Sequence, residues 1–170
     1  MSITGTSNIS GNISNANVTA KDSILSFAEN TFADTNLTTD GGSVNLNDGK
    51  TNTHTIKTLT AGDTTNWSID FDIGNKTADK IITNNASSGK IILDNLNIIN
   101  GTIADIPSEQ IGTEFIVQVL DTQNDDLQLD LSDYVKSQLG NEKYVIGRQT
   151  DYFDDKVKTV TSWSDIYNRY

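Results

Sequence analysis

Short apolar segments separated by small polar turns run along most of the chain, and residues 65–93 show the pattern most clearly. Four apolar side chains alternate there with polar ones: Trp67, Ile69, Phe71 and Ile73. A period of two residues is typical of a β-strand with one buried face. The Gly74-Asn75 and Ser88-Gly89 pairs that follow are residues that reverse a chain easily. The pattern predicts strand, turn, strand, turn, strand.

Similar apolar segments recur from Ile9 to Leu96, at roughly the 8–12-residue spacing of an all-β chain. An all-β chain with this spacing is either a sandwich or a solenoid. A sandwich has longer strands and a denser apolar core, whereas a parallel β-helix has short strands and coils of about 20 or more residues. Leu46, Trp67 and Ile91 are spaced in that range. We therefore predict a parallel β-helix over residues 1–105.

Pro107 is the single proline and marks a change of organisation. We interpret residues 106–170 as the last coils and a C-terminal cap, because a solenoid must cover its open apolar end. The pattern predicts strands at 114–120, 127–131, 144–147 and 157–160, and a short helix at 132–139 that Ser132 caps and Gly140 ends. Four aromatic residues near the end are candidates for a binding patch, with burial in the cap as the alternative: Tyr152, Phe153, Trp163 and Tyr167.

Composition supports a solenoid and excludes several partners. Hydrophobic residues make up 35% of the 170 residues, which is little for a globular core but sufficient where neighbouring coils complete the core. The net charge is -11, so we expect no binding to nucleic acid or to anionic membranes. No apolar run is long enough to cross a bilayer. Cysteine is absent, which excludes disulfides and thiolate metal sites.

Residues 67–96 resemble the C-terminal passenger region of bacterial autotransporters. The resemblance is carried by an alternating strand that ends in an acidic residue (67–72), an Ala-Asp-Lys-Ile-Ile segment (78–82) and a Ser-Gly-apolar strand (88–91). It implies a right-handed parallel β-helix that is exported across the outer membrane, displayed at the cell surface or secreted. It also implies a translocating barrel downstream in the parent protein. It transfers no catalytic residue to this chain.

Met1 to Gly11 are polar and lack the apolar core of a signal peptide. We therefore interpret the sequence as a segment of a longer exported protein.

Candidate chemistry is sparse. His54 is the single histidine, and a Ser-His-Asp triad would need it. No Gly-x-Ser-x-Gly elbow accompanies it, so we predict an exposed turn or strand histidine. Asp70, Asp72 and Asp79 are the candidate calcium ligands. The alternative, which the ligand count favours, is a solvated strand face plus a turn aspartate.

These observations favour a non-enzymatic structural or adhesive segment of a surface protein, which needs no cofactor other than the calcium considered above. Its partner would be a glycan or a protein on a host or cell surface. The alternative is a carbohydrate-binding or carbohydrate-active β-helix, a polysaccharide hydrolase or lyase, because Asp125-Asp126 and Asp154-Asp155 supply paired carboxylates. The strand at 114–120 is the most apolar and is the predicted folding nucleus.

Overall fold

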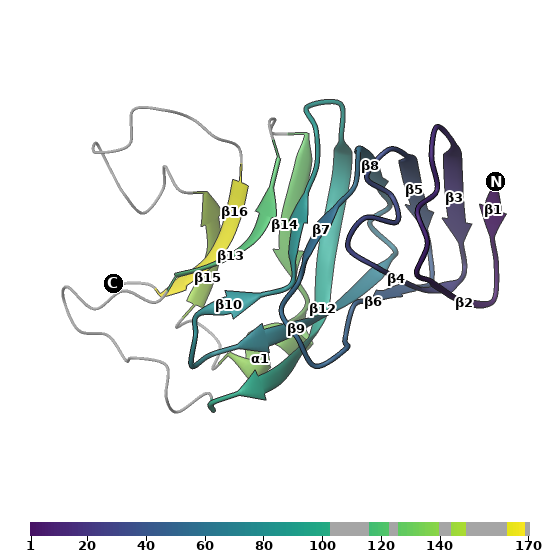
Figure 1. Cartoon of the computed structure of the whole chain (residues 1–170). Coiled ribbons are helices and arrows are strands. Elements are labelled where there is room, and N and C mark those ends of the chain that lie inside the picture. Colours follow the sequence, from purple (N-terminus) through teal and green to yellow (C-terminus); the bar gives the residue numbers. More distant parts are fainter. Residues whose placement is uncertain (103–115, 123–125, 140–143, 149–162, 169–170) are drawn as a thin grey trace.

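The computed structural model shows a stack of coils, each built from short parallel strands (Figure 1). The structure describes residues 1–102, 116–122, 126–139, 144–148 and 163–168. The chain is an all-β parallel β-helix, as the alternating pattern predicts. β1 lies at one end of the stack, and β15 and β16 lie at the other (Figure 1).

The strands before β13 are short, and all of them except β12 have seven residues or fewer. They are β1 (Ser2–Ile3), β2 (Thr6–Ile9), β3 (Asn17–Lys21), β4 (Ile24–Phe27), β5 (Asn36–Asp40), β6 (Ser43–Asn45), β7 (Thr53–Thr55), β8 (Thr58–Ala61), β9 (Asn66–Asp72), β10 (Thr77–Ala78), β11 (Lys80–Ile82) and β12 (Ser88–Asn100). The later elements are β13 (Ile116–Asp121), β14 (Leu127–Leu131), α1 (Asp133–Gln138), β15 (Tyr144–Arg148) and β16 (Trp163–Asn168).

The strands form three faces around one core. One face contains β1, β3, β5, β8 and the start of β12, and a second contains β2, β4, β6, β9 and the rest of β12. β7, β11 and β13 run parallel on the third face. Because β12 pairs with strands of both of the first two faces, those faces join into one sheet, which has eleven strands when β10, paired with β9, and β14, paired with β12, are included.

Inward side chains on each face form rows that run from coil to coil. On the second face Leu25 pairs with Val44, Val44 with Trp67 and Trp67 with Leu93, and all four are buried. Their residue numbers differ by 19, 23 and 26, so successive coils lengthen toward the C-terminus. The predicted coil length is confirmed, although Trp67 aligns with Val44 and Leu93 rather than with Leu46 and Ile91.

Ser88-Gly89 begins β12, so the prediction of a turn at this pair is wrong. Gly89 has a φ of 99° and pairs with Ala61 of β8. A Cβ atom on Gly89 would lie 1.9 Å from the Ala61 carbonyl oxygen. Glycine is needed here because two backbones approach closely in a conformation that side chains disfavour.

We expect Gly89→Ala to lower the free energy of unfolding by about 2 to 4 kcal/mol, since both the positive φ and the Ala61 contact oppose a methyl group. Urea unfolding followed by circular dichroism would measure the loss. Gly49→Ala is the control: Gly49 also has a positive φ, but a Cβ atom there meets nothing within 4 Å. Equal losses in the two variants would show that the Ala61 contact contributes nothing.

Beyond β12 the organisation changes. β13 continues the third face in parallel with β11, but β16 pairs antiparallel with β13, and β15 antiparallel with β16. The predicted helix is confirmed as α1, with the Ser132 hydroxyl accepting a hydrogen bond from the Val135 N–H. Trp163 and Tyr167 lie on β16. Tyr152, Phe153 and the strand predicted at 157–160 lie outside the described residues.

Candidate functional site

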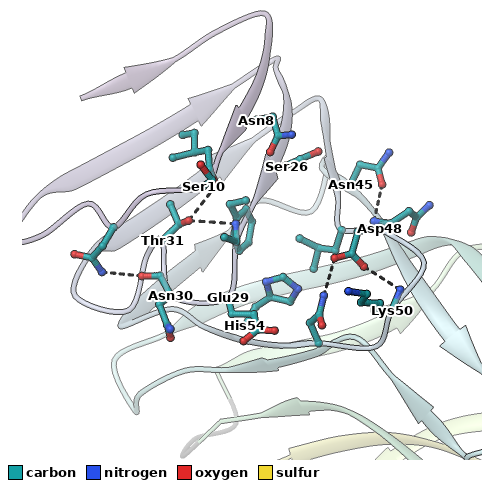
Figure 2. A pocket seen from close by; sticks show the side chains of 17 residues that line it. Asn8, Ser10, Ser26, Glu29, Asn30, Thr31, Asn45, Asp48, Lys50 and His54 are labelled. Atoms are coloured by element: carbon teal, nitrogen blue, oxygen red, sulfur yellow. Dashed lines mark hydrogen bonds between the residues drawn. The ribbon is translucent and has the colours of Figure 1, made fainter.

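A polar groove opens beside the ends of β2, β4 and β6 and has a volume of about 730 Å³. Asparagine dominates its lining: Asn8, Asn12, Asn30, Asn45, Asn47 and Asn52. The charged side chains at the groove are Glu29, Asp48 and Lys50, and His54 lies among them (Figure 2). This density of hydrogen-bonding groups in a concavity makes the groove the candidate functional site.

The groove forms because the connections that follow the strands of the second face differ in length from coil to coil. The connections after β2 and β4 span residues 10–16 and 28–35 and contain no strand, whereas residues 46–57 after β6 are longer and include β7. The two shorter connections lie side by side, since the Asn12 amide donates to the Asn30 carbonyl oxygen at 2.7 Å. Residues 46–52, which we call the loop wall, form the opposite side of the groove.

A buried carboxylate holds the loop wall in place. Asp70 Oδ2 accepts hydrogen bonds from the backbone N–H groups of Asp48, Gly49 and Lys50 at 2.8, 2.9 and 3.2 Å. Its other oxygen accepts from the Asn97 amide at 2.6 Å. Asp70 points outward from β9 in the alternating pattern, yet the loop wall covers it and its exposure is 0%. The carboxylate thereby replaces the strand partners that the loop wall lacks.

Two further aspartates act in the same way. Asp79 is fully buried and accepts from the N–H groups of Asn52 and Asp70 at 2.8 and 2.7 Å. Asp72 accepts from the N–H of Asn75 and from its side-chain amide, both at 2.8 Å. These hydrogen bonds lower the pKa of Asp72, and the bond from the Asn75 side chain has the largest effect. All three carboxylates therefore organise loops and turns through hydrogen bonds.

The solvated strand face predicted for Asp70 and Asp72 is wrong, because both are buried. Asp79, predicted as a turn aspartate, lies between β10 and β11 and is buried as well. Within the described part of the chain, no group of three or more acidic, histidine or cysteine side chains is arranged to hold a metal ion. The carboxylate oxygens that calcium would need already accept hydrogen bonds from amides.

His54 is also placed differently from the prediction of an exposed residue. It lies on β7, where it pairs with Ile81 of β11, and Ile81 pairs in turn with Leu120 of β13. His54 thus takes an inward position in a row that its neighbours fill with aliphatic side chains, and only 2% of it is exposed. Its ring packs edge-on against Phe27, with centroids 5.4 Å apart.

Among the described residues, no group forms a hydrogen bond of normal geometry with either ring nitrogen of His54. Nε2 lies 3.9 Å from Asp79 Oδ1, beyond hydrogen-bonding distance. Burial lowers the pKa of His54, while the Ala28 backbone and the charges of Glu29 and Asp48 act in the opposite direction. Burial also raises the pKa of Asp79 to about 7, against the two backbone hydrogen bonds it accepts. Burial thus favours the neutral form of each side chain.

The two shifts have opposite effects on stability. Because the pKa of Asp79 is raised from 3.8 to about 7, its contribution is complete below pH 3.8 and is lost as the pH rises through 7. Because the pKa of His54 is lowered from 6.5, its contribution is present above pH 6.5 and is lost as the pH falls through the lowered value. Substitutions at the two positions should separate these effects.

We expect the free energy of unfolding of His54→Phe to increase relative to that of wild type as the pH falls below 6.5, since the variant has no buried imidazole to protonate. Asp79→Asn should show the reverse trend, with its deficit narrowing as the pH rises through 7. Urea unfolding at a series of pH values measures both differences, and contributions from the other acids cancel. Differences that stay constant across pH would contradict both shifts.

Most groove residues could not be predicted from the sequence. The groove joins three connections that are about one coil apart in sequence, and strand periodicity does not report which turn side chains meet. A usable signal was the polar run at residues 45–50, which contains Asn45, Asn47, Asp48 and Lys50 but reads only as a turn. Asp126 is not among the residues that line the groove, and Asp125, Asp154 and Asp155 lie outside the described residues.

Within the part of the chain that the structure describes, no helix has the length and apolar character needed to cross a lipid bilayer. Comparisons with protein-family models, with curated proteins and with solved structures find no match to this chain.

Proposed function

We propose that this chain is a non-enzymatic structural and adhesive segment of an exported bacterial protein of the autotransporter-passenger type, secreted or displayed at the cell surface. The observation that carries the proposal is the stack itself. Its inward rows are buried and its outward strand positions are polar, for example in β3 and β5, where exposed or half-buried residues alternate with buried ones. Such a stack combines rigidity with a long exposed surface.

Adhesion is tested with beads that carry the purified chain. We expect these beads to be retained on layers of epithelial or bacterial cells more strongly than beads that carry an unrelated protein of equal net charge. The acidic control matters because the net charge of -11 repels cell surfaces in either case. Retention no greater than that of the control on every cell layer would reject the adhesive role.

The C-terminal coils are proposed to help the parent passenger fold during export. β13 supports this role: Val117, Val119 and Leu120 are buried, and the strand pairs on both sides, with β11 and β16. A strand paired on both sides and rich in buried apolar residues is a suitable template for the coils that follow it in folding.

Carbohydrate binding or carbohydrate cleavage is the second candidate function, and the groove favours it. Glu29 and Asp48 supply two carboxylates and Lys50 a positive charge in one concavity, which are the group types that glycoside chemistry uses. Incubation with a panel of polysaccharides, followed by measurement of new reducing ends and unsaturated products, separates cleavage from binding. Product release by wild type but not by Glu29→Gln would replace the adhesive proposal with an enzymatic one.

A further inference from the structure

Two side chains that line the groove have polar atoms without a partner among the described residues. Asn47, on the loop wall, has a buried Oδ1 of this kind. The orientation of this amide is fixed, because its Nδ2 donates to Ser68 Oγ at 2.8 Å. His54, at the groove and 2% exposed, adds two ring nitrogens without partners, of which one accepts hydrogen bonds when the ring is neutral. Unsatisfied buried acceptors favour a ligand that donates hydrogen bonds.

The charges at the groove restrict that ligand further. Glu29 is exposed on the connection after β4, and Asp48 is exposed on the loop wall opposite. Both act on the ring of His54 between them. Among the described residues that line the groove, Lys50 is the one cation. Two carboxylates against one ammonium group give the groove a negative charge, which attracts cationic ligands and repels anionic ones.

Polar side chains repeat along the groove at the spacing of the strands. Asn8 of β2 pairs with Ser26 of β4. Leu25 pairs with Val44, so the next residues, Ser26 and Asn45, are also neighbours, and all three line the groove (Figure 2). Adjacent strands lie about 4.8 Å apart. Sugar rings in a linear oligosaccharide repeat their hydroxyl groups at a comparable distance, so this array suits an oligomer.

We infer that the groove binds a short linear oligosaccharide of amino sugars, with hydroxyl and ammonium groups of the ligand donating to Glu29 and Asp48 and a hydroxyl group donating to the neutral ring of His54. This inference rests on the proposed adhesive function and names the class of ligand for it. Amino sugars combine the many hydroxyl donors that the acceptors need with the positive charge that the two carboxylates favour. Uronic acids have the wrong charge.

The test titrates a linear glucosamine tetrasaccharide into the purified chain below neutral pH, where the amines are protonated. We expect saturable shifts of the Glu29, Asp48 and Lys50 amide signals in nitrogen-15 spectra, and no shifts with a galacturonic acid tetrasaccharide. Glu29→Gln should raise the Kd about tenfold, the effect of losing one charge-assisted hydrogen bond. Asp63→Asn, which removes an exposed acid outside the groove lining, should leave the Kd unchanged.

His54→Phe provides a second variant, because phenylalanine fills the space of the ring and removes both nitrogens. We expect weaker tetrasaccharide binding with no loss of thermal stability. The inference is overturned if wild type does not bind the tetrasaccharide, if Glu29→Gln binds as tightly as wild type, or if Asp63→Asn weakens binding equally. In the last case the attraction is a property of the whole acidic surface.

The bead assay separates this inference from the proposed function. Bead retention without tetrasaccharide binding would overturn the amino-sugar ligand and leave adhesion standing. Tetrasaccharide binding without bead retention on any cell layer would overturn adhesion and leave the ligand site standing.

Discussion

Val117→Asp is expected to abolish most of the folded yield of this chain and to lower the melting temperature of any folded fraction. Val117 has an exposure of 0% on β13, and β13 is paired with β11 and β16. A carboxylate placed there without a partner costs several kcal/mol, a large part of the roughly 5 to 15 kcal/mol that stabilises a typical domain.

The matched control for this substitution is Gln118→Asp. Gln118 is the next residue on the same strand, and it is half-buried where Val117 is fully buried. The same carboxylate there lies opposite Asp165 of β16, so it should cost at most about 1 kcal/mol, far less than at Val117, and most of the folded yield should remain. If Val117→Asp left yield and melting temperature unchanged, β13 would be neither a core strand nor the folding nucleus.

Refolding rates can separate the nucleus from the core. If the C-terminal coils form first, Val117→Ala should slow refolding, whereas Val18→Ala in the first coils, which truncates an equally buried valine, should mainly speed unfolding. If instead Val18→Ala slowed refolding and Val117→Ala mainly sped unfolding, the nucleus would lie in the first coils.

Asp70→Ala is expected to lower the free energy of unfolding by about 3 kcal/mol, because three backbone N–H groups of the loop wall and the Asn97 amide lose their acceptor. The estimate is below the sum for four buried donors, since residues 48–50 are exposed and water reaches part of the loop. Urea unfolding measures the loss, and Asp63→Ala at an exposed position is the control.

The same substitution should release the groove wall before it unfolds the stack. Amide exchange at Gly49 and Lys50 is expected to become fast in Asp70→Ala, while exchange at Leu59 on β8 stays slow under native conditions. Asp70→Asn should be milder, because one oxygen still accepts from the loop while the new amide opposes the Asn97 amide. Unchanged amide exchange at Gly49 in Asp70→Ala would show that the loop wall keeps its conformation without the hydrogen bonds to Asp70.

Local patterns predicted the strands and the helix cap well. The alternation at 67–73 became β9, residues 127–131 became β14 with the same bounds, and Ser132 caps α1. In each case the residues themselves decide the outcome, through a period of two or a side chain that reaches its own helix.

The failures share a different cause. The Ser88-Gly89 pair predicts a turn, because the sequence does not show that the Ala61 backbone lies against Gly89. Asp70 and His54 were expected to face solvent. One is covered by a loop from the preceding coil, and the other takes an apolar row position beside Ile81. All three outcomes depend on the register between coils, and the groove depends on it as well.

Because successive coils differ in length, each layer of the stack is distinct from its neighbours. In a solenoid of identical repeats, a strand can pair one repeat too far and still find matching partners. Here the steps from Leu25 to Val44, Trp67 and Leu93 lengthen each time. If a strand were displaced by one coil, the connection on one side of it would therefore be too long and the connection on the other side too short. The increase in coil length therefore disfavours misregistered strand pairing during folding. It selects one register of the strands although the sequence contains no repeat that would specify it.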